Sequence, residues 1–290
     1  MNILISTCSQ GLIYAILALG VYITFRILNF ADMTAEGSLT LGGSTCAILI
    51  SNGVDPISSV LISSAVGAIA GLATALLHTT LKMQEILAGI LTMISLYSIN
   101  LRIMGKANVS LIGKNTIFKM VGNTQISSFL VGLVICSLLL FGLTWFFKTQ
   151  IGLAIRATGD NEQMMRAQGA NTNLKKILAL MISNSICAFS GALISQSQGY
   201  SDVNMGTGTI VIALASIVIG EALLQKDSFI VKLVSVVFGS ICYRFIIFLV
   251  LTLGMNPSDL KLFTAILAAV LLSLPNIKKV IKRGVKNVGN

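Results

Sequence analysis

The densest group of ionisable and amide side chains lies in a polar loop between the fifth and sixth long apolar runs of the sequence. Asp160 can accept hydrogen bonds from the free amides of a first helical turn, and Gln163 follows three residues later, as in a capping box. Glu162 suits the positive start of a helix, and Gly169 suits the left-handed position after its end. The pattern therefore predicts a short surface helix over about Asn161–Gln168.

Two interpretations of this helix are possible. Met164 and Met165 offer an adaptable apolar contact to a partner protein. The alternative is an ordinary cytoplasmic loop that happens to be helical. The residues alone favour neither interpretation.

A second polar group interrupts an apolar run with Asn29, Asp32 and Glu36. Such side chains are expensive in lipid, so they should face protein, water or a solute. A broken helix here would expose backbone groups to a solute. For Asp32, a helix cap beside Thr34 and a place in a solute path are equally good interpretations.

Arg244 lies deep inside another apolar run and must face a cavity or a partner carboxylate. Glu221 and Lys232 lie at the ends of apolar runs, where they can reach the interface by snorkelling. The single histidine, His78, makes a metal site or a proton relay unexpected. We expect the five cysteines to be packing residues, because they are odd in number and lie inside apolar runs.

Catalytic and nucleotide-binding motifs are absent from the sequence. It contains no GxxxxGK[ST] phosphate loop, no HExxH and no GxSxG. We therefore expect neither enzymatic activity nor ATP binding by this chain itself. We also expect no cofactor in it.

Composition identifies the solvent of this chain. Of its 290 residues 55% are apolar and 10% are charged, and the mean hydropathy is +0.90. Soluble domains carry about 25% charged residues, so the lipid bilayer is the expected surroundings. The net charge of +10 comes from basic residues between apolar runs and in the tail, which is typical of positive-inside topology and not of nucleic-acid binding.

The apolar runs predict an all-α, polytopic membrane bundle with about nine segments of roughly 20 residues each. The second and seventh are short and are candidates for broken or re-entrant helices. Gly67 and Gly71 form a GxxxG pair, which we interpret as a helix-packing contact. The predicted segments are Leu4–Leu28, Glu36–Ser51, Ile57–Thr80, Ile86–Met104, Ser127–Phe147, Lys176–Ser195, Thr209–Leu224, Phe229–Leu253 and Leu260–Leu274.

The chain divides into a transmembrane domain over residues 1–275, which includes a cytoplasmic loop over 148–176, and a basic tail over 276–290. Lys and Arg residues in this loop and in the tail place both of them, and the C-terminus, in the cytoplasm. The basic residues of the Gly105–Ile126 loop, which falls outside, violate this rule mildly. We expect no cleavable signal peptide.

The stretch Gly152–Gly169, with the apolar run that follows it, resembles the cytoplasmic loop of the branched-chain amino acid and ribose-type ABC importer permeases. The run Gly11–Gly20 with Leu28-Asn29-Phe30-Ala31 resembles the first helix and turn of that family. The run Ala213–Glu221 resembles a late helix. Asp32-Met33-Thr34 and Gly220-Glu221 fit best a subgroup of amino-acid permeases that includes tryptophan and tyrosine uptake systems.

The resemblance implies a type II-like ABC importer permease of the bacterial cell membrane. Its partners would be a cytoplasmic ATP-binding subunit, an extracytoplasmic solute-binding protein and a second permease copy, which we expect to form a homodimer. The short helix would be the coupling helix that docks on the ATPase. The residues that this implies for coupling are Arg156, Asp160, Asn161, Glu162, Met165, Arg166, Ala167 and Gly169.

The resemblance also places the Asn29 turn near the central axis of a dimer. We therefore expect Asn29, Phe30 and Asp32 to belong to the translocation path of a small solute, and the subgroup resemblance implies that this solute is an amino acid. The alternatives are ABC import of a sugar or nucleoside, and an ion-coupled secondary transporter. A membrane enzyme would need a set of catalytic residues and a receptor would need an appended soluble domain, and neither is visible in the sequence.

Overall fold

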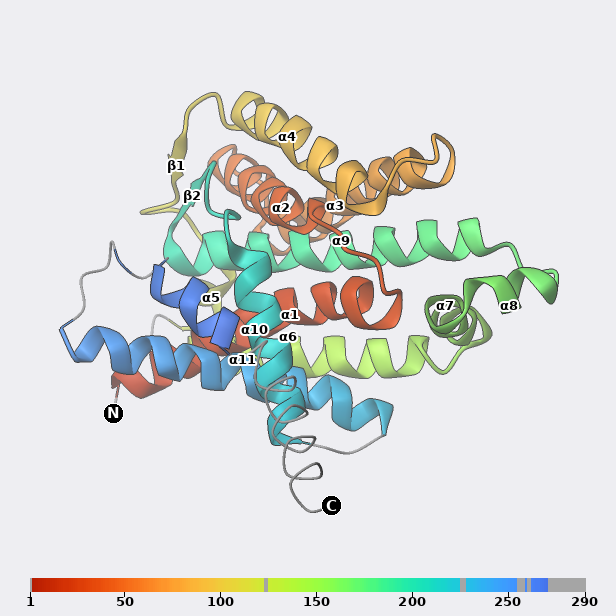
Figure 1. Cartoon of the computed structure of the whole chain (residues 1–290). Helices are drawn as coiled ribbons and strands as arrows, with labels where there is room; N and C mark the ends of the chain where they lie inside the picture. Colours follow the sequence, from red (N-terminus) through yellow and green to blue (C-terminus); the bar gives the residue numbers. More distant parts are fainter. Residues whose placement is uncertain (1, 123–124, 225–227, 255–258, 260–261, 271–290) are drawn as a thin grey trace, which may run out of the picture.

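Long apolar helices make up most of the chain (Figure 1). A computed structural model describes residues 2–122, 125–224, 228–254, 259 and 262–270. The longer helices are α1 (Asn2–Tyr22), α2 (Thr34–Ser51), α3 (Pro56–Thr79), α4 (Glu85–Met104), α6 (Gln125–Phe146), α9 (Thr172–Gln198), α10 (Thr209–Leu223) and α11 (Phe229–Thr252). The shorter elements are a π-helical turn η1 (Ile23–Ile27), α5 (Ile117–Val121), α7 (Gln150–Asp160) and α8 (Glu162–Ala167).

Six helices in the described part of the chain are long and apolar enough to cross a membrane. They are Leu4–Ile27, Pro56–Thr79, Glu85–Met104, Ile126–Phe146, Thr172–Gln198 and Phe229–Thr252. The two segments predicted to be short correspond to α2 and to α10, which is apolar but has only 15 residues. The ninth predicted segment is described only over 262–270, which is helical, and the basic tail lies outside the described residues. The predicted count of nine is therefore not confirmed.

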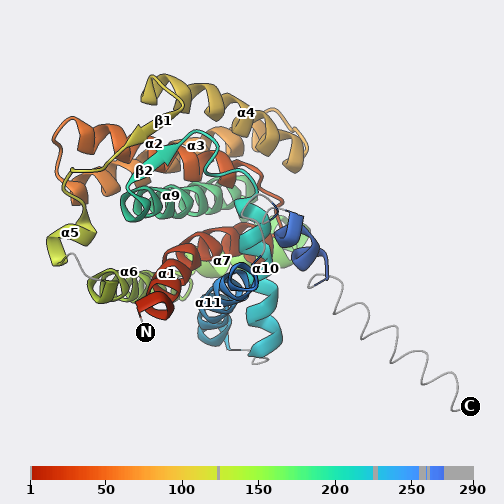
Figure 2. The ribbon, with the colours of Figure 1, turned by 90° about the vertical axis from the view of Figure 1, so that its left-hand side faces the viewer.

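Helix α9 lies at the centre of the bundle and packs against α1, α2 and α3 (Figures 1 and 2). Small residues allow this close approach. A Cβ atom at Gly67 would clash with Ala188, and one at Gly71 would clash with the carbonyl of Leu180. The predicted packing role of the GxxxG pair is thus confirmed.

The outer helices α4 and α6 leave large apolar side chains uncovered. Leu138, Phe141 and Trp145 are 66%, 73% and 67% exposed. In water such a surface would be unfavourable, whereas in hydrocarbon it costs nothing. The exposure of α6 agrees with the bilayer as the expected surroundings.

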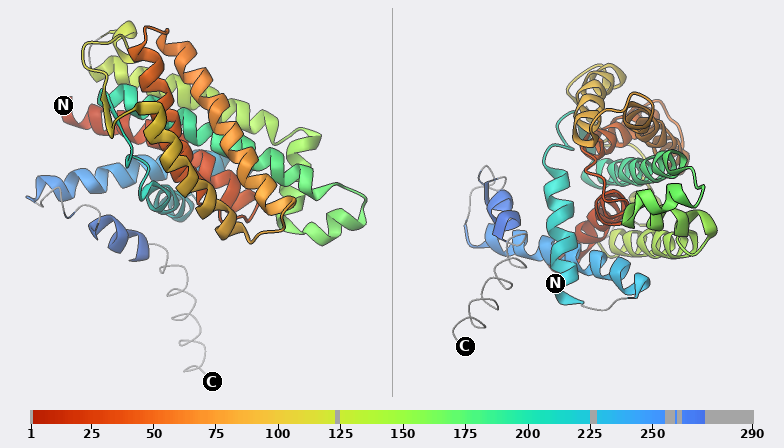
Figure 3. Two further views of the ribbon diagram at one scale, coloured as in Figure 1. Left: turned by 90° about the horizontal axis from the view of Figure 1, so that it is seen from above. Right: turned by 45° about the vertical axis from the view of Figure 1, so that its right-hand side comes forward.

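Two connections pair as short strands, which the sequence did not predict. β1 (Asn108–Ser110) and β2 (Tyr200–Asp202) are antiparallel, with Val109 opposite Ser201. The pair satisfies backbone groups of two loops that would otherwise be irregular. It lies at one end of the bundle, while α7 and α8 lie at the opposite end (Figures 1 and 3).

Candidate functional site: the α7–α8 elbow and the end of α1

The polar loop folds into two helices joined at Asn161. The sequence predicted only the second of them, and it assigned the N-cap to Asp160. In the structure Asp160 is the last residue of α7, and the side chain of Asn161 caps α8 by accepting from the amide of Met164 at 2.9 Å. Helix α7 was missed because its amphipathic residues precede the polar run that gave the signal.

The short helix α8 ends at Ala167, and Gly169, which follows the C-cap Gln168, has the predicted left-handed conformation with φ of +80°. Its methionines diverge: Met165 is buried inside the subunit, whereas Met164 is 44% exposed. The apolar contact predicted for both methionines therefore falls to Met164, which shares the exposed surface with Gln163 and Ala167.

An ion-pair network fixes α8 to the start of α9. The carboxylate of Glu162 pairs with Arg166 at 2.6 Å and with Lys176 at 3.0 Å, and it accepts from the Thr172 hydroxyl at 3.1 Å. Burial alone would raise the pKa of Glu162, but the hydrogen bond and charge of Lys176, with Thr172 and Arg166, lower it overall. The carboxylate is therefore held in its charged form.

The network continues into the bundle through His78. The Lys176 Nζ lies 3.2 Å from Nε2 of His78, and Nδ1 lies 2.9 Å from the carbonyl of Met83. These contacts assign the proton to Nδ1, so that Nε2 accepts from the ammonium. The ring of Phe30 meets that of His78 edge to face, with 5.1 Å between centroids. A continuous set of contacts thus runs from α8 to the turn after α1.

A second contact joins α7 to the same turn. Helix α1 passes into the π-helical turn η1, and Asn29 follows with φ of +53°, a conformation that asparagine tolerates. Its side-chain amide donates to the carbonyl of Gly159 at 3.0 Å. A Cβ atom at Gly159 would clash with the carbonyl of Ile27, so glycine permits this approach.

The residues predicted for the solute path lie at this turn. Asn29 is exposed, whereas Phe30 and Asp32 are buried. Asp32 accepts from the amide of Thr34 at 2.9 Å, as its cap interpretation requires, and from the side chain of Asn184 at 2.7 Å. Their part in translocation stays a prediction.

The other predicted coupling residues surround the elbow. Arg156 stacks over the ring of Phe229 at 4.6 Å, and Arg166 also donates from Nε to Thr172 at 3.0 Å. A further ion pair joins Arg26 to Glu221 and so links η1, which follows α1, to the end of α10. Within the described residues no cluster of three His, Cys, Asp or Glu side chains could hold a metal.

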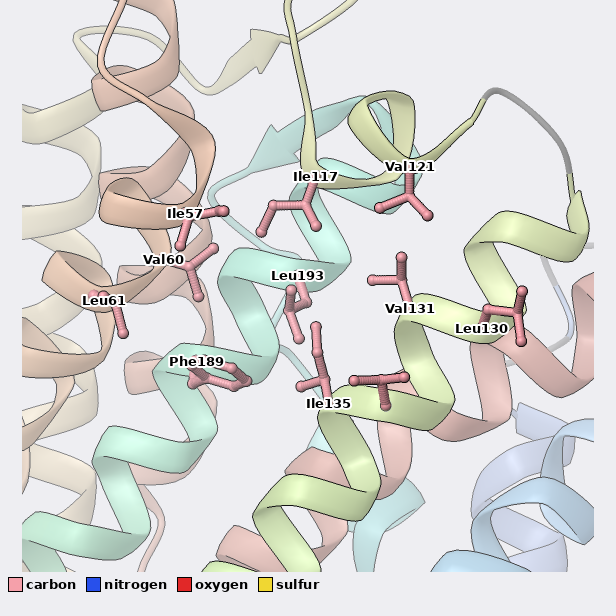
Figure 4. Close-up of a pocket in the computed structure, with 11 residues that line it drawn as sticks. Ile57, Val60, Leu61, Ile117, Val121, Leu130, Val131, Ile135, Phe189 and Leu193 are labelled. Carbon is pink, nitrogen blue, oxygen red and sulfur yellow. The ribbon is translucent and has the colours of Figure 1, made fainter.

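Two cavities of different chemistry lie elsewhere in the bundle. One, of about 400 Å³, is lined by apolar side chains of α3, α5, α6 and α9 (Figure 4). The other, of about 340 Å³, is lined by Arg244 together with Tyr14, Thr207 and Thr209. The prediction that Arg244 faces a cavity or a carboxylate is thus met by a cavity.

Comparison with known proteins identifies the chain. Residues 3–274 match the family described as the branched-chain amino acid transport system permease component. The chain belongs to this family of ABC importer permeases. The permease is 44% identical over 286 residues to the tyrosine transport system permease protein of Clostridioides difficile strain R20291, with 98% of this chain and 95% of that protein covered.

More distant similarities extend this comparison. The ribose import permease protein of Escherichia coli K12 is 23% identical to the permease, with 76% of this chain and 69% of that protein covered. The solved structure of PsaBC from Streptococcus pneumoniae in complex with Fab matches with a TM-score of 0.51 and 17% identity, and covers 94% of this chain and 90% of that one. At this identity the match concerns the fold alone.

Proposed function

We propose that this permease translocates an amino acid of the tyrosine class across the bacterial cell membrane, as a subunit of a binding-protein-dependent ABC importer. The observation that supports this choice of substrate is the 44% identity, over 98% of the chain, to a tyrosine transport system permease protein. In this proposal a cytoplasmic subunit binds ATP, an external protein delivers the solute, and two permease copies form the path.

Helix α8 is the coupling helix in this proposal. Its exposed residues Gln163, Met164 and Ala167 form the surface that meets the ATP-binding subunit. Glu162, Arg166 and Lys176 hold that surface to α9 by ion pairs. Because a six-residue helix is marginal by itself, these contacts are what allow it to transmit a displacement.

The displacement reaches the turn after α1 by two sets of contacts. One passes from Lys176 to His78 and Phe30, and the other passes from Gly159 to Asn29. Asn29, being exposed, is available to a solute, while Phe30 and Asp32 act on the path by positioning this turn and the start of α2. The elbow can therefore move the turn without a long flexible connection.

Thiol labelling tests the role of the turn. In a chain without its native cysteines, Asn29→Cys should react with a small water-soluble reagent, at a rate that ATP and solute-loaded binding protein change. Phe30→Cys should react slowly, because its side chain is buried. Absence of labelling at both positions in every transport state would mean that the turn is only packing.

Uptake by the reconstituted transporter tests the substrate. Proteoliposomes that contain the permease, its ATP-binding subunit and its binding protein should accumulate labelled L-tyrosine only when ATP is present. Ribose uptake without tyrosine uptake would favour the sugar alternative, for which the ribose import relative is the motive. Uptake driven by an ion gradient without ATP would refute the ABC mechanism.

A further inference from the structure

The cavity beside α11 contains an arginine that has no acidic partner among the described residues. None of the three ion pairs among the described residues involves Arg244, and its Nε has no hydrogen-bond partner there. Its guanidinium lies over the ring of Tyr14, 3.6 Å from the centroid. This contact orients the group, and Nε stays without an acceptor among the described residues.

A charge in this position is expensive unless something binds to it. Arg244 belongs to α11, one of the helices long and apolar enough to span the membrane. Arginine keeps its proton in proteins, so it cannot escape the cost of burial by becoming neutral. Ionisable residues in such helices face a cavity or a partner for this reason. Arg244 has the cavity, in which it is the one charged side chain among the lining residues.

The remaining walls of the cavity combine polar and apolar groups. Helix α10 begins at the cavity with Gly208 as N-cap, at φ of +82°, and the amide of Gly208 donates to the carboxylate of Glu36 at 2.9 Å. The first turn of α10 therefore already has an anionic partner, and Arg244 is the positive group that the cavity lining offers to a ligand. Thr207 adds an exposed hydroxyl, and Tyr14 and Ile247 add apolar surface. Polar groups that converge in a largely apolar cavity are typical of small-molecule sites.

We propose that Arg244 and the cavity that it lines form a binding site for the carboxylate of the transported solute. A guanidinium can hold a carboxylate by two parallel hydrogen bonds. The site deepens the proposed function and rests on it for the identity of the solute, but its affinity for a carboxylate-sized anion stands independently. A neutral sugar could accept hydrogen bonds from Arg244 through its hydroxyls, but it has no negative charge to pair with the guanidinium.

Charge-selective labelling tests the site without reference to transport. The probe is Thr207→Cys, in the full transporter purified in detergent with its five native cysteines replaced. Its reactivity is compared between an anionic sulfonate and a cationic trimethylammonium methanethiosulfonate. Arg244 should favour the anionic reagent, and Arg244→Gln should lower the ratio of anionic to cationic rates about tenfold. Asn204→Cys, on the same loop but outside the cavity lining, is the control whose ratio should not depend on Arg244.

Uptake then connects the site to the solute. L-Tyrosine uptake should fall about tenfold or more in Arg244→Gln and should be partly retained in Arg244→Lys, since a charge-assisted hydrogen bond is lost in the first and weakened in the second. Arg102→Gln, on α4 and away from the cavity, should leave uptake unchanged. If the labelling ratio at position 207 is the same in wild type and Arg244→Gln, the proposed site is refuted. Full uptake in Arg244→Gln would refute it as well. If the labelling ratio falls in Arg244→Gln but the transporter does not import tyrosine, the anion site is supported and the proposed substrate is refuted.

Discussion

Glu162 is the residue on which the contacts of α8 converge. Its carboxylate meets Arg166, Lys176 and Thr172, and through Lys176 it reaches His78. The sequence indicated that Glu162 lies in the first turn of a helix. It did not indicate Lys176 or Thr172, because these partners lie ten or more residues away and no periodicity connects them.

Removing the charge of Glu162 tests this network. Glu162→Gln should reduce ATP-driven uptake several-fold, because α8 would lose its link to α9, and should cost roughly 1 kcal/mol of unfolding free energy. Glu85→Gln, at the start of α4 on the same end of the bundle and without an ion pair among the described residues, is the matched control. Equal uptake in the two variants would show that the network has no part in coupling.

The pH dependence of the same contact follows from the lowered pKa of Glu162. A carboxyl whose pKa is depressed in the folded state stabilises that state above its ordinary pKa, about 4.5, and loses this contribution as the pH falls through the lower folded value. The stability difference between wild type and Glu162→Gln should therefore be constant from neutral pH down to about pH 5 and shrink at lower pH. Thermal unfolding of both proteins across this range measures it, and a difference that already disappears near pH 6 would contradict the assignment.

At the scale of elements, the important junction is that of α7 with the end of α1. The glycine that permits it, Gly159, carries no signal in a single sequence, because its need arises only when Ile27 comes to lie against it. The sequence did predict α8, its terminal glycine and the interruption near Asn29, because these follow from local capping and from polar residues in an apolar run. It placed the cap one residue early and missed α7 and the β1–β2 pair, which depend on contacts between distant segments.

Adding a methyl group at position 159 tests the packing at this junction. Gly159→Ala should destabilise the permease by roughly 1–3 kcal/mol through overpacking against Ile27, although alanine is the better helix former. Gly142→Ala, in α6, places its methyl in open space and should be neutral or slightly stabilising. The measurement is thermal unfolding with uptake in parallel. A Gly159→Ala variant that is as stable and as active as Gly142→Ala would mean that close packing of α7 against the turn after α1 is not needed for stability or uptake.

At the scale of the whole molecule, the elbow and the β1–β2 pair mark opposite ends of the bundle (Figure 1). The elbow end should be cytoplasmic, because it carries the surface that we propose for the ATP-binding subunit. Composition and apolar runs were sufficient to predict a helical membrane bundle. They were not sufficient to count the segments that cross the membrane, because an apolar run can form a helix such as α10, which has only 15 residues.

The side of the C-terminus is a separate prediction at this scale. A green fluorescent protein fused after Asn290 should fluoresce and an alkaline phosphatase fused there should be inactive, because the basic tail should stay in the cytoplasm. An active phosphatase fusion would reverse the orientation of the whole bundle. Fusions in the Gly105–Ile126 loop, expected outside, provide the control of opposite sign.

The contact between α8 and the ATP-binding subunit is the central claim, and site-specific photocross-linking tests it most directly. A benzophenone attached to Met164→Cys, in a cysteine-free permease assembled with its partners, should form an adduct with the ATP-binding subunit. The same group on Phe141→Cys, exposed on α6, should not. Absence of the adduct at position 164, in a complex whose ATP hydrolysis still responds to solute-loaded binding protein, would contradict the account.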